Sequence, residues 1–172
     1  MSLLKKIFKI ILISVTLLLV TLVILIWFLI SVINGRDHVS DEDLIKNLQI
    51  NSKKYTRLIT MFREDYPIKV VHPTWLDPKN SITEGRWNQY KVLFKDLELD
   101  AGMRSWGGES IEFISTARGL VTGGSSKGYV YKPISHLPLY VSLSEAPKDL
   151  KSNVRAYRKI NDIWYITYTW DD

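Results

Sequence analysis

The chain has no cysteine, and this absence excludes several kinds of chemistry at once. Without a thiol, the protein forms no disulfide and holds no thiolate-bound metal, and it cannot be acylated as a bacterial lipoprotein is. Histidine is also scarce, since the chain has only His38, His72 and His136, and they are far apart. No H-x-x-x-H or similar spacing of metal ligands occurs, so the sequence predicts neither a metal nor another cofactor.

Charged residues are absent from residues 10–33, a run of 24 residues made mostly of Leu, Ile, Val, Phe and Trp. At about 1.5 Å per residue this run forms a helix of roughly 36 Å, which can cross a hydrocarbon core of about 30 Å. A cleaved signal peptide has a shorter apolar region and ends at a small-residue site, but residues 31–35 contain no A-x-A-like pair. The sequence therefore predicts an uncleaved transmembrane signal anchor.

The basic residues that flank the apolar run predict its orientation. Three lysines precede the run: Lys5, Lys6 and Lys9. Only Arg36 follows it closely, and Lys and Arg beside a span are retained in the cytoplasm. Residues 1–9 are therefore expected in the cytoplasm of a bacterium. Residues 36–172 are then an exported domain, periplasmic or extracellular, attached to the inner (cytoplasmic) membrane by a single pass.

The exported domain has a nearly balanced charge. Three of the 23 Lys and Arg residues precede the apolar run and all 18 Asp and Glu residues follow it, which leaves the exported part at only +2. A nucleic-acid-binding protein needs a concentrated basic face, so no nucleic-acid partner is expected. Its length of about 135 residues is typical of one domain whose core needs no disulfides.

Residues 41–65 have the periodicity of an amphipathic helix. The apolar arc contains Leu44, Ile45, Leu48, Tyr55, Leu58, Ile59 and Phe62. Ser40 and Asp43 resemble a capping box at the start of this segment, with Asp in place of Glu. Asn51 and Ser52 place two polar residues on the apolar arc, so the segment forms either one helix or two.

Residues 83–99 form the second expected amphipathic helix. Ser81 and Glu84 resemble a capping box before it, and Gly102 is the expected cap at its other end. The expected buried face contains Trp87, Tyr90, Leu93, Phe94 and Leu97.

From residue 111 onward the apolar residues recur with a period of two, which predicts β-strands. The expected strands are residues 111–117, 119–122, 129–132, 139–143, 154–160 and 163–170, with a short strand at 68–72 between the two helices. Asn161 and Asp162 form the expected hairpin turn between the last two. The predicted fold class is therefore α+β: an N-terminal transmembrane helix, then two amphipathic helices packed on an antiparallel sheet of about six strands.

Residues 123–128, which read GGSSKG, form the first glycine-rich stretch with candidate site residues. They do not match a phosphate loop, because the lysine precedes the last glycine and strands flank both sides, so a hairpin loop is expected. A dyad of Ser125 and Lys127 is the catalytic alternative, since a desolvated lysine can activate a hydroxyl. Lys127 and Tyr129 are candidate binding residues, because exposed aromatic rings in this region would stack on sugars or peptides.

Residues 102–109 form the second glycine-rich stretch, and they bring Arg104 and Trp106 into an expected loop. Arginine and tryptophan dominate binding hot spots, and loops on a rigid sheet collect binding residues. Arg104 and Trp106 are therefore candidate binding residues. The alternative is that Trp106 fills the bottom of the core.

Four short patterns carry a resemblance to known proteins: Asp41-Glu42-x-Leu44-Ile45, Tyr55-x-x-Leu58-x-x-Met61-Phe62, Ser126-Lys127-Gly128-Tyr129, and Tyr157-Arg158-x-Ile160 with Trp164-Tyr165. With these patterns the chain resembles a group of small uncharacterised bacterial envelope proteins. Such proteins combine an N-terminal anchor or lipoprotein signal with a small α+β domain that ends in a Trp-Tyr strand. The resemblance implies a fold and a location, and no activity comes with it.

The sequence contains no recognisable set of catalytic residues, which favours a non-catalytic protein-binding module over an enzyme. The expected partners are the membrane and another envelope protein. Two alternatives stay open. One is a hydrolase that acts on an envelope polymer, and the other is an immunity-type protein that blocks a toxin acting outside the cytoplasm.

Overall fold

The computed structural model divides the chain into two units and describes residues 3–33, 38–120, 123–135 and 138–171. Side chains are described for residues 8–27, 38–119, 123–135 and 138–170. The first unit contains α1 (Leu3–Ile33). Its part from Phe8 to Trp27 is exposed along its whole length and is long and apolar enough to cross a membrane. The apolar helix that the sequence predicts is therefore present.

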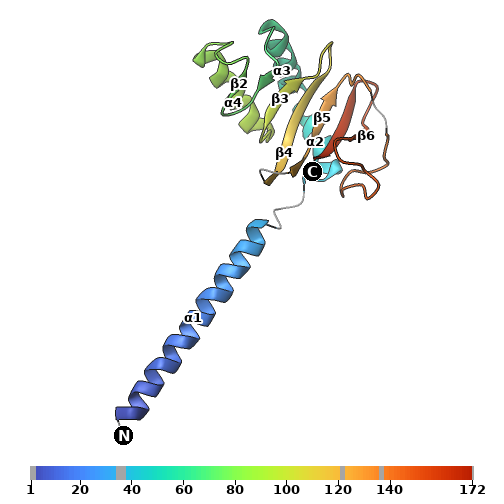
Figure 1. The fold of residues 1–172 in the computed structure, drawn as a ribbon. Helices are drawn as coiled ribbons and strands as arrows, with labels where there is room; N and C mark the ends of the chain where they lie inside the picture. The colour runs from blue at the N-terminus through green and yellow to red at the C-terminus, as the bar shows by residue number, and fades with distance from the viewer. Residues whose placement is uncertain (1–2, 34–37, 121–122, 136–137, 172) are drawn as a thin grey trace. The chain divides into compact units, whose positions relative to one another are not determined.

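The second unit is an α+β domain, as expected from the sequence (Figure 1). Its helices are α2 (Asp41–Ile50), α3 (Ser52–Glu64) and α4 (Glu84–Leu97). Its strands are β1 (Val70–Val71), β2 (Leu76–Asp77), β3 (Gly102–Ser105), β4 (Ile111–Leu120), β5 (Gly123–Tyr131), β6 (Arg155–Lys159) and β7 (Trp164–Asp171). They form one seven-stranded sheet in the order β2-β1-β3-β4-β5-β7-β6, and all neighbouring strands are antiparallel.

The first predicted helical segment begins as expected and then divides into α2 and α3. The Ser40 hydroxyl accepts a hydrogen bond from the Asp43 N–H at 3.1 Å, which confirms the predicted cap. Asn51, with φ of −105° and ψ of 18°, departs from helical geometry between the two helices. Of the two readings of this segment, the one with two helices is therefore confirmed.

Both predicted caps of the second amphipathic helix are wrong. The N-cap of α4 is Thr83 rather than Ser81, and the Thr83 hydroxyl accepts a backbone N–H at 3.2 Å. The helix ends at Glu98, which adopts the left-handed conformation with φ of 56°. Gly102 instead begins β3, where a Cβ atom would lie 2.1 Å from the Val71 carbonyl oxygen. A glycine is required there because β1 and β3 approach closely.

The centre of the sheet is more continuous than the sequence pattern predicts. The expected strands 111–117 and 119–122 form the single strand β4, although residues 121–122 themselves lie outside the described residues. Residues 123–128, expected as a hairpin loop, are instead the first part of β5. A Cβ atom on Gly128 would lie 2.0 Å from a carbonyl oxygen of β4, so glycine serves close strand packing there and does not form a turn.

Other strand predictions are confirmed in part. The strand expected at 68–72 shortens to β1, and β2 and β3 are added beside it. Residues 139–143 form no strand of their own, and only an isolated bridge joins this segment to β6. β6 and β7 form the antiparallel hairpin that Asn161 and Asp162 predict.

The three helices pack on one face of the sheet, and the main core lies between them. A row of cross-strand partners on this helix-covered face is completely buried: Met103, Phe113, Tyr129 and Ile166. The Tyr55 ring of α3 contacts this row, with its centre 5.4 Å from that of Phe113 and 5.2 Å from that of Tyr129. The neighbouring row lies on the second face and contains Arg104, Glu112, Val130 and Tyr165.

Candidate binding site

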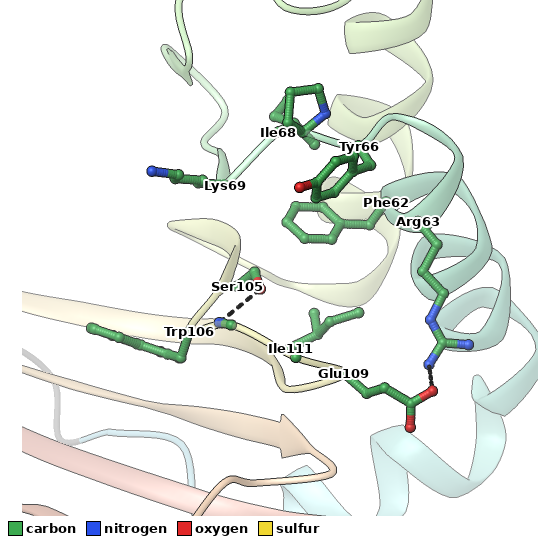
Figure 2. A pocket seen from close by; sticks show the side chains of 12 residues that line it. Phe62, Arg63, Tyr66, Ile68, Lys69, Ser105, Trp106, Glu109 and Ile111 are labelled. Atoms are coloured by element: carbon green, nitrogen blue, oxygen red, sulfur yellow. Dashed lines mark hydrogen bonds and ion pairs between the residues drawn. The ribbon is translucent and has the colours of Figure 1, made fainter.

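A hollow of about 620 Å³ lies between the end of α3 and the turn that joins β3 to β4. We call it the β3–β4 hollow, and Figure 2 shows the side chains that line it. One part of its lining comes from the end of α3 and the segment that leads to β1. The other part comes from the turn between β3 and β4 and from the start of β4. The principal lining residues are Phe62, Arg63, Tyr66, Ile68, Lys69, Ser105, Trp106, Glu109 and Ile111. The volume falls within the range of small-ligand sites.

The β3–β4 hollow has an apolar floor and aromatic walls. Phe62, Ile68 and Ile111 are at most 5% exposed. In contrast, Tyr66 is 84% exposed and Trp106 is 47% exposed. Figure 2 shows Tyr66 and Phe62 on one side of the hollow, with Trp106 and Ile111 on the other. Large rings that remain in solvent beside a buried apolar floor offer contact area to a ligand.

Charged side chains surround the β3–β4 hollow. Glu109, on the turn, accepts a hydrogen bond from Lys132 and lies 3.5 Å from an Arg63 guanidinium nitrogen. The hydrogen bond from Lys132 holds the pKa of the Glu109 carboxyl below its ordinary value. Lys69 is exposed, and none of the side chains that the structure describes forms an ion pair with it. The surroundings therefore combine three cations with one carboxylate.

Trp106 is held in place by two arginines and a buried carboxylate. Its indole N–H donates to Glu112 Oε2 at 2.5 Å, and Arg104 Nε donates to the same oxygen at 2.7 Å. The guanidinium carbons of Arg104 and Arg155 lie 4.5 and 4.3 Å from the centre of the Trp106 ring system, within cation–π range. Trp106 therefore does not fill the core, because its oriented ring is nearly half exposed. Arg104 contacts this ring and does not line the hollow.

The other two candidate binding residues, Lys127 and Tyr129, lie inside the domain on β5. Neither is more than 1% exposed. Lys127 Nζ lies 2.7 Å from Asp41 Oδ1, and the Tyr129 hydroxyl donates to the Leu44 carbonyl at 2.8 Å. Both side chains thus fasten α2 to β5, and the structure does not bring them together with Trp106.

Asp41 is the centre of a buried polar cluster at the start of α2. Its Oδ2 accepts hydrogen bonds from the Leu143 N–H and from an Arg158 guanidinium nitrogen, each at 2.6 Å. Burial raises the pKa of the Asp41 carboxyl, but the hydrogen bonds from Lys127, Leu143 and Arg158 outweigh burial, so the pKa lies below its ordinary value. The carboxylate is therefore charged inside the domain and compensated by two cations.

His38 makes a contact that the sequence did not predict. Its Nε2 lies 2.8 Å from Ser125 Oγ, its Nδ1 lies 2.6 Å from Thr116 Oγ1, and its ring meets the Tyr168 ring edge-on at 5.3 Å. A nucleophilic catalytic triad contains a serine in contact with a histidine, and its third member is a carboxylate that orients the histidine. Here a threonine hydroxyl occupies that position. Ser125 and Lys127 also have different partners, so they do not form the dyad that was the catalytic alternative.

Of the other two histidines, the structure describes His72. His72 contacts the Thr74 hydroxyl at 2.8 Å and stacks on Trp75, and burial lowers its pKa. His136 lies outside the described residues. Among the described residues, no group of three His, Asp or Glu side chains is placed to hold a metal ion.

Two residues of the β3–β4 hollow, Tyr66 and Lys69, were not predicted as site residues. Tyr66 follows α3 in an irregular segment, and Lys69 lies in the segment expected as a short strand, where a single exposed lysine is no signal of a site. The hollow can bind a ligand through apolar, aromatic and charged contacts.

Comparison of the chain with models of known protein families, with curated protein sequences and with solved structures found no match.

Proposed function

We propose that this protein is a membrane-anchored, non-catalytic binding module whose exported domain captures another envelope protein at the β3–β4 hollow. The observation that carries the proposal is the two exposed aromatic rings on opposite sides of the apolar floor, with Tyr66 84% and Trp106 47% exposed. Tryptophan, tyrosine and arginine dominate binding hot spots. The contacts from Glu112 and Arg104 also orient the Trp106 ring in advance, which lowers the entropy that binding costs.

The anchoring part of the proposal rests on α1 and on the residues that flank it. The segment from Phe8 to Trp27 is apolar and long enough to cross a bilayer. Lys5 and Lys6 precede this segment and Lys9 lies at its start, and the three lysines favour a cytoplasmic N-terminus. The domain that follows is then outside the cytoplasm, where another envelope protein is accessible.

The chemistry of the hollow favours binding over catalysis. Glu109 is the only carboxylate in its described lining, and two cations hold it in the charged form. A general acid needs a raised pKa and a general base needs a free carboxylate or imidazole near the reacting group. Glu109 meets neither requirement, and the lining supplies no histidine.

The proposal is tested by photo-crosslinking with the full chain in its membrane. The photoreactive amino acid p-benzoylphenylalanine replaces Tyr66, and Val141, which is 93% exposed and does not line the hollow, serves as the control position. We expect one discrete protein adduct at position 66 and none at 141. The adduct should be lost when Trp106→Ala is added and retained with Trp75→Ala, since Trp75 is 49% exposed but lies outside the hollow. The same adducts at both positions would contradict the proposal.

A hydrolase acting on an envelope polymer is the second candidate, and the contact between Ser125 and His38 favours it. A serine activated in this way reacts covalently with a fluorophosphonate probe. Because the second nitrogen of His38 contacts the Thr116 hydroxyl, where a catalytic triad has its carboxylate, we expect no labelling of the wild-type chain. Labelling that disappears in Ser125→Ala would show an activated serine and favour the hydrolase instead.

A further inference from the structure

We propose that the β3–β4 hollow binds an acidic segment of its partner, and that this segment also carries an apolar side chain. In the free protein, Glu109 occupies the position that a carboxylate of the partner occupies in the complex. This inference rests on the proposed function, because it specifies the chemistry of the ligand at the same site.

The floor of the hollow selects an apolar side chain. Phe62, Ile68 and Ile111 offer carbon surface, and a ring or branched aliphatic group placed on them would be covered by Tyr66. A sugar is less suited to this lining, because its hydroxyls require several amide or carboxylate partners. Apart from the Trp106 N–H, which Glu112 already accepts, the described lining offers only two neutral polar side-chain groups: the hydroxyls of Ser105 and Tyr66.

The charges around the hollow select an acidic segment. Lys69 and Arg63 line it and Lys132 lies next to it, whereas Glu109 is the only carboxylate among them. Arg63 and Lys132 both interact with Glu109, so Lys69 is the cation that a ligand can engage without displacing a side chain among the described residues. A carboxylate from the partner would therefore find one available cation and two more behind Glu109.

Glu109 has the geometry of a replaceable internal ligand. Its side chain is 62% exposed and bridges Arg63 and Lys132 from a turn that contains Gly107 and Gly108, both with positive φ. Exposed ion pairs contribute little free energy, so an incoming carboxylate can exchange with Glu109 at small cost. Removing the charge of Glu109 should then strengthen binding of an acidic ligand. If Glu109 instead contacted the ligand favourably, the same change would weaken binding.

The test selects binders from a displayed library of random seven-residue peptides on the full chain in phosphatidylcholine nanodiscs. We expect the enriched peptides to combine Asp or Glu with an aromatic or branched aliphatic residue. The affinity of one enriched peptide is then measured by fluorescence anisotropy. Lys69→Gln should weaken binding about fivefold, as expected for one exposed charge pair, and Glu109→Gln should strengthen it by a similar factor. Lys148→Gln, a change at an exposed lysine outside the hollow, should have no effect.

The outcomes separate this inference from the proposed function. If the enriched peptides are neutral or basic and do not bind the Tyr66→Ala, Trp106→Ala double variant, the inference of an acidic ligand is overturned and the proposed binding module is kept. Weaker binding of acidic peptides by Glu109→Gln would overturn the exchange at Glu109. Peptides that bind the double variant as well as the wild type, or no enriched peptide at all, would overturn both. Unchanged thermal unfolding of the variants excludes loss of fold as the cause.

Discussion

Replacing Lys127 by methionine removes one ion from the buried cluster that fastens α2 to the sheet. The Lys127 ammonium and the Asp41 carboxylate lie 2.7 Å apart, and both side chains are 0% exposed. Methionine keeps the apolar stem of the lysine, so the change mainly removes the charge. Breaking a buried ion pair by removing one partner costs about 3–5 kcal/mol, because the other charge stays buried.

The remaining contacts decide where each variant falls in this range. After Lys127→Met, Asp41 still accepts hydrogen bonds from Arg158 and from the Leu143 N–H, each at 2.6 Å, so we expect a loss of about 3 kcal/mol. Asp41→Asn removes the negative charge that lies 2.7 Å from the Lys127 ammonium, and the neutral amide oxygen that replaces it does not compensate the buried cation. We therefore expect a loss nearer 5 kcal/mol for Asp41→Asn.

The measurement is urea unfolding of the full chain in detergent, followed by tryptophan fluorescence, with stability compared at a constant dependence on denaturant. Because Lys127 and Asp41 form one group, the double variant should lose about 1–3 kcal/mol less than the sum of the two single losses. A loss below about 1 kcal/mol for Lys127→Met, or strict additivity in the double variant, would refute the idea that this pair holds α2 in place.

Three further predictions follow from the topology, the titration of Asp41 and the backbone. A reporter fused after Asp172 should be active only if its activity requires export, and activity of a cytoplasmic reporter there would contradict the orientation. The folded-state pKa of Asp41 is lowered, so the contribution of its carboxylate to the free energy of unfolding is complete above the unfolded value of about 3.9 and is lost as the pH falls through the folded value. The free energy of unfolding should therefore decrease less with falling pH in Asp41→Asn than in the wild type. Gly102→Ala should destabilise the domain by more than about 1 kcal/mol in the same urea assay, because φ is +73° and its Cβ would meet Val71, whereas Gly85→Ala in α4 has open space and should not destabilise it.

Features with a local cause were predicted from the sequence. Ser40 caps α2 because its hydroxyl reaches an N–H only three residues away. Residues 10–33 are helical, as expected for an uninterrupted run of uncharged, mostly apolar residues that is long enough for many helical turns. The alternation in 163–170 also predicts the faces of β7, where Ile166 is completely buried on the helix-covered face. In each case the residues that decide the structure are neighbours in the chain.

Features that depend on distant residues were not predicted. Lys127 stands in a glycine-rich stretch that suggests an exposed loop, and its partner Asp41 lies in a different element at the start of the domain. Gly128 suggested a turn, whereas the close approach of β4 is what requires it. Of the candidate binding residues, only Trp106 lines the β3–β4 hollow, because Arg104 turns to Glu112. The register between neighbouring strands determines which residues these side chains contact, and this register cannot be inferred from a short stretch of the sequence.

The contacts at the beginning of the domain also determine how a mechanical load would enter it. A pull through the segment before His38 acts first on the contacts of this histidine with Thr116 in β4 and Ser125 in β5. It acts next on Asp41, which is bound to Lys127 in β5. Since β5 is hydrogen-bonded to β4 on one side and β7 on the other, the load spreads across the middle of the sheet and does not peel α2 away turn by turn. A load applied at the start of the domain would therefore reach the central strands of the sheet before it reached the helical turns of α2.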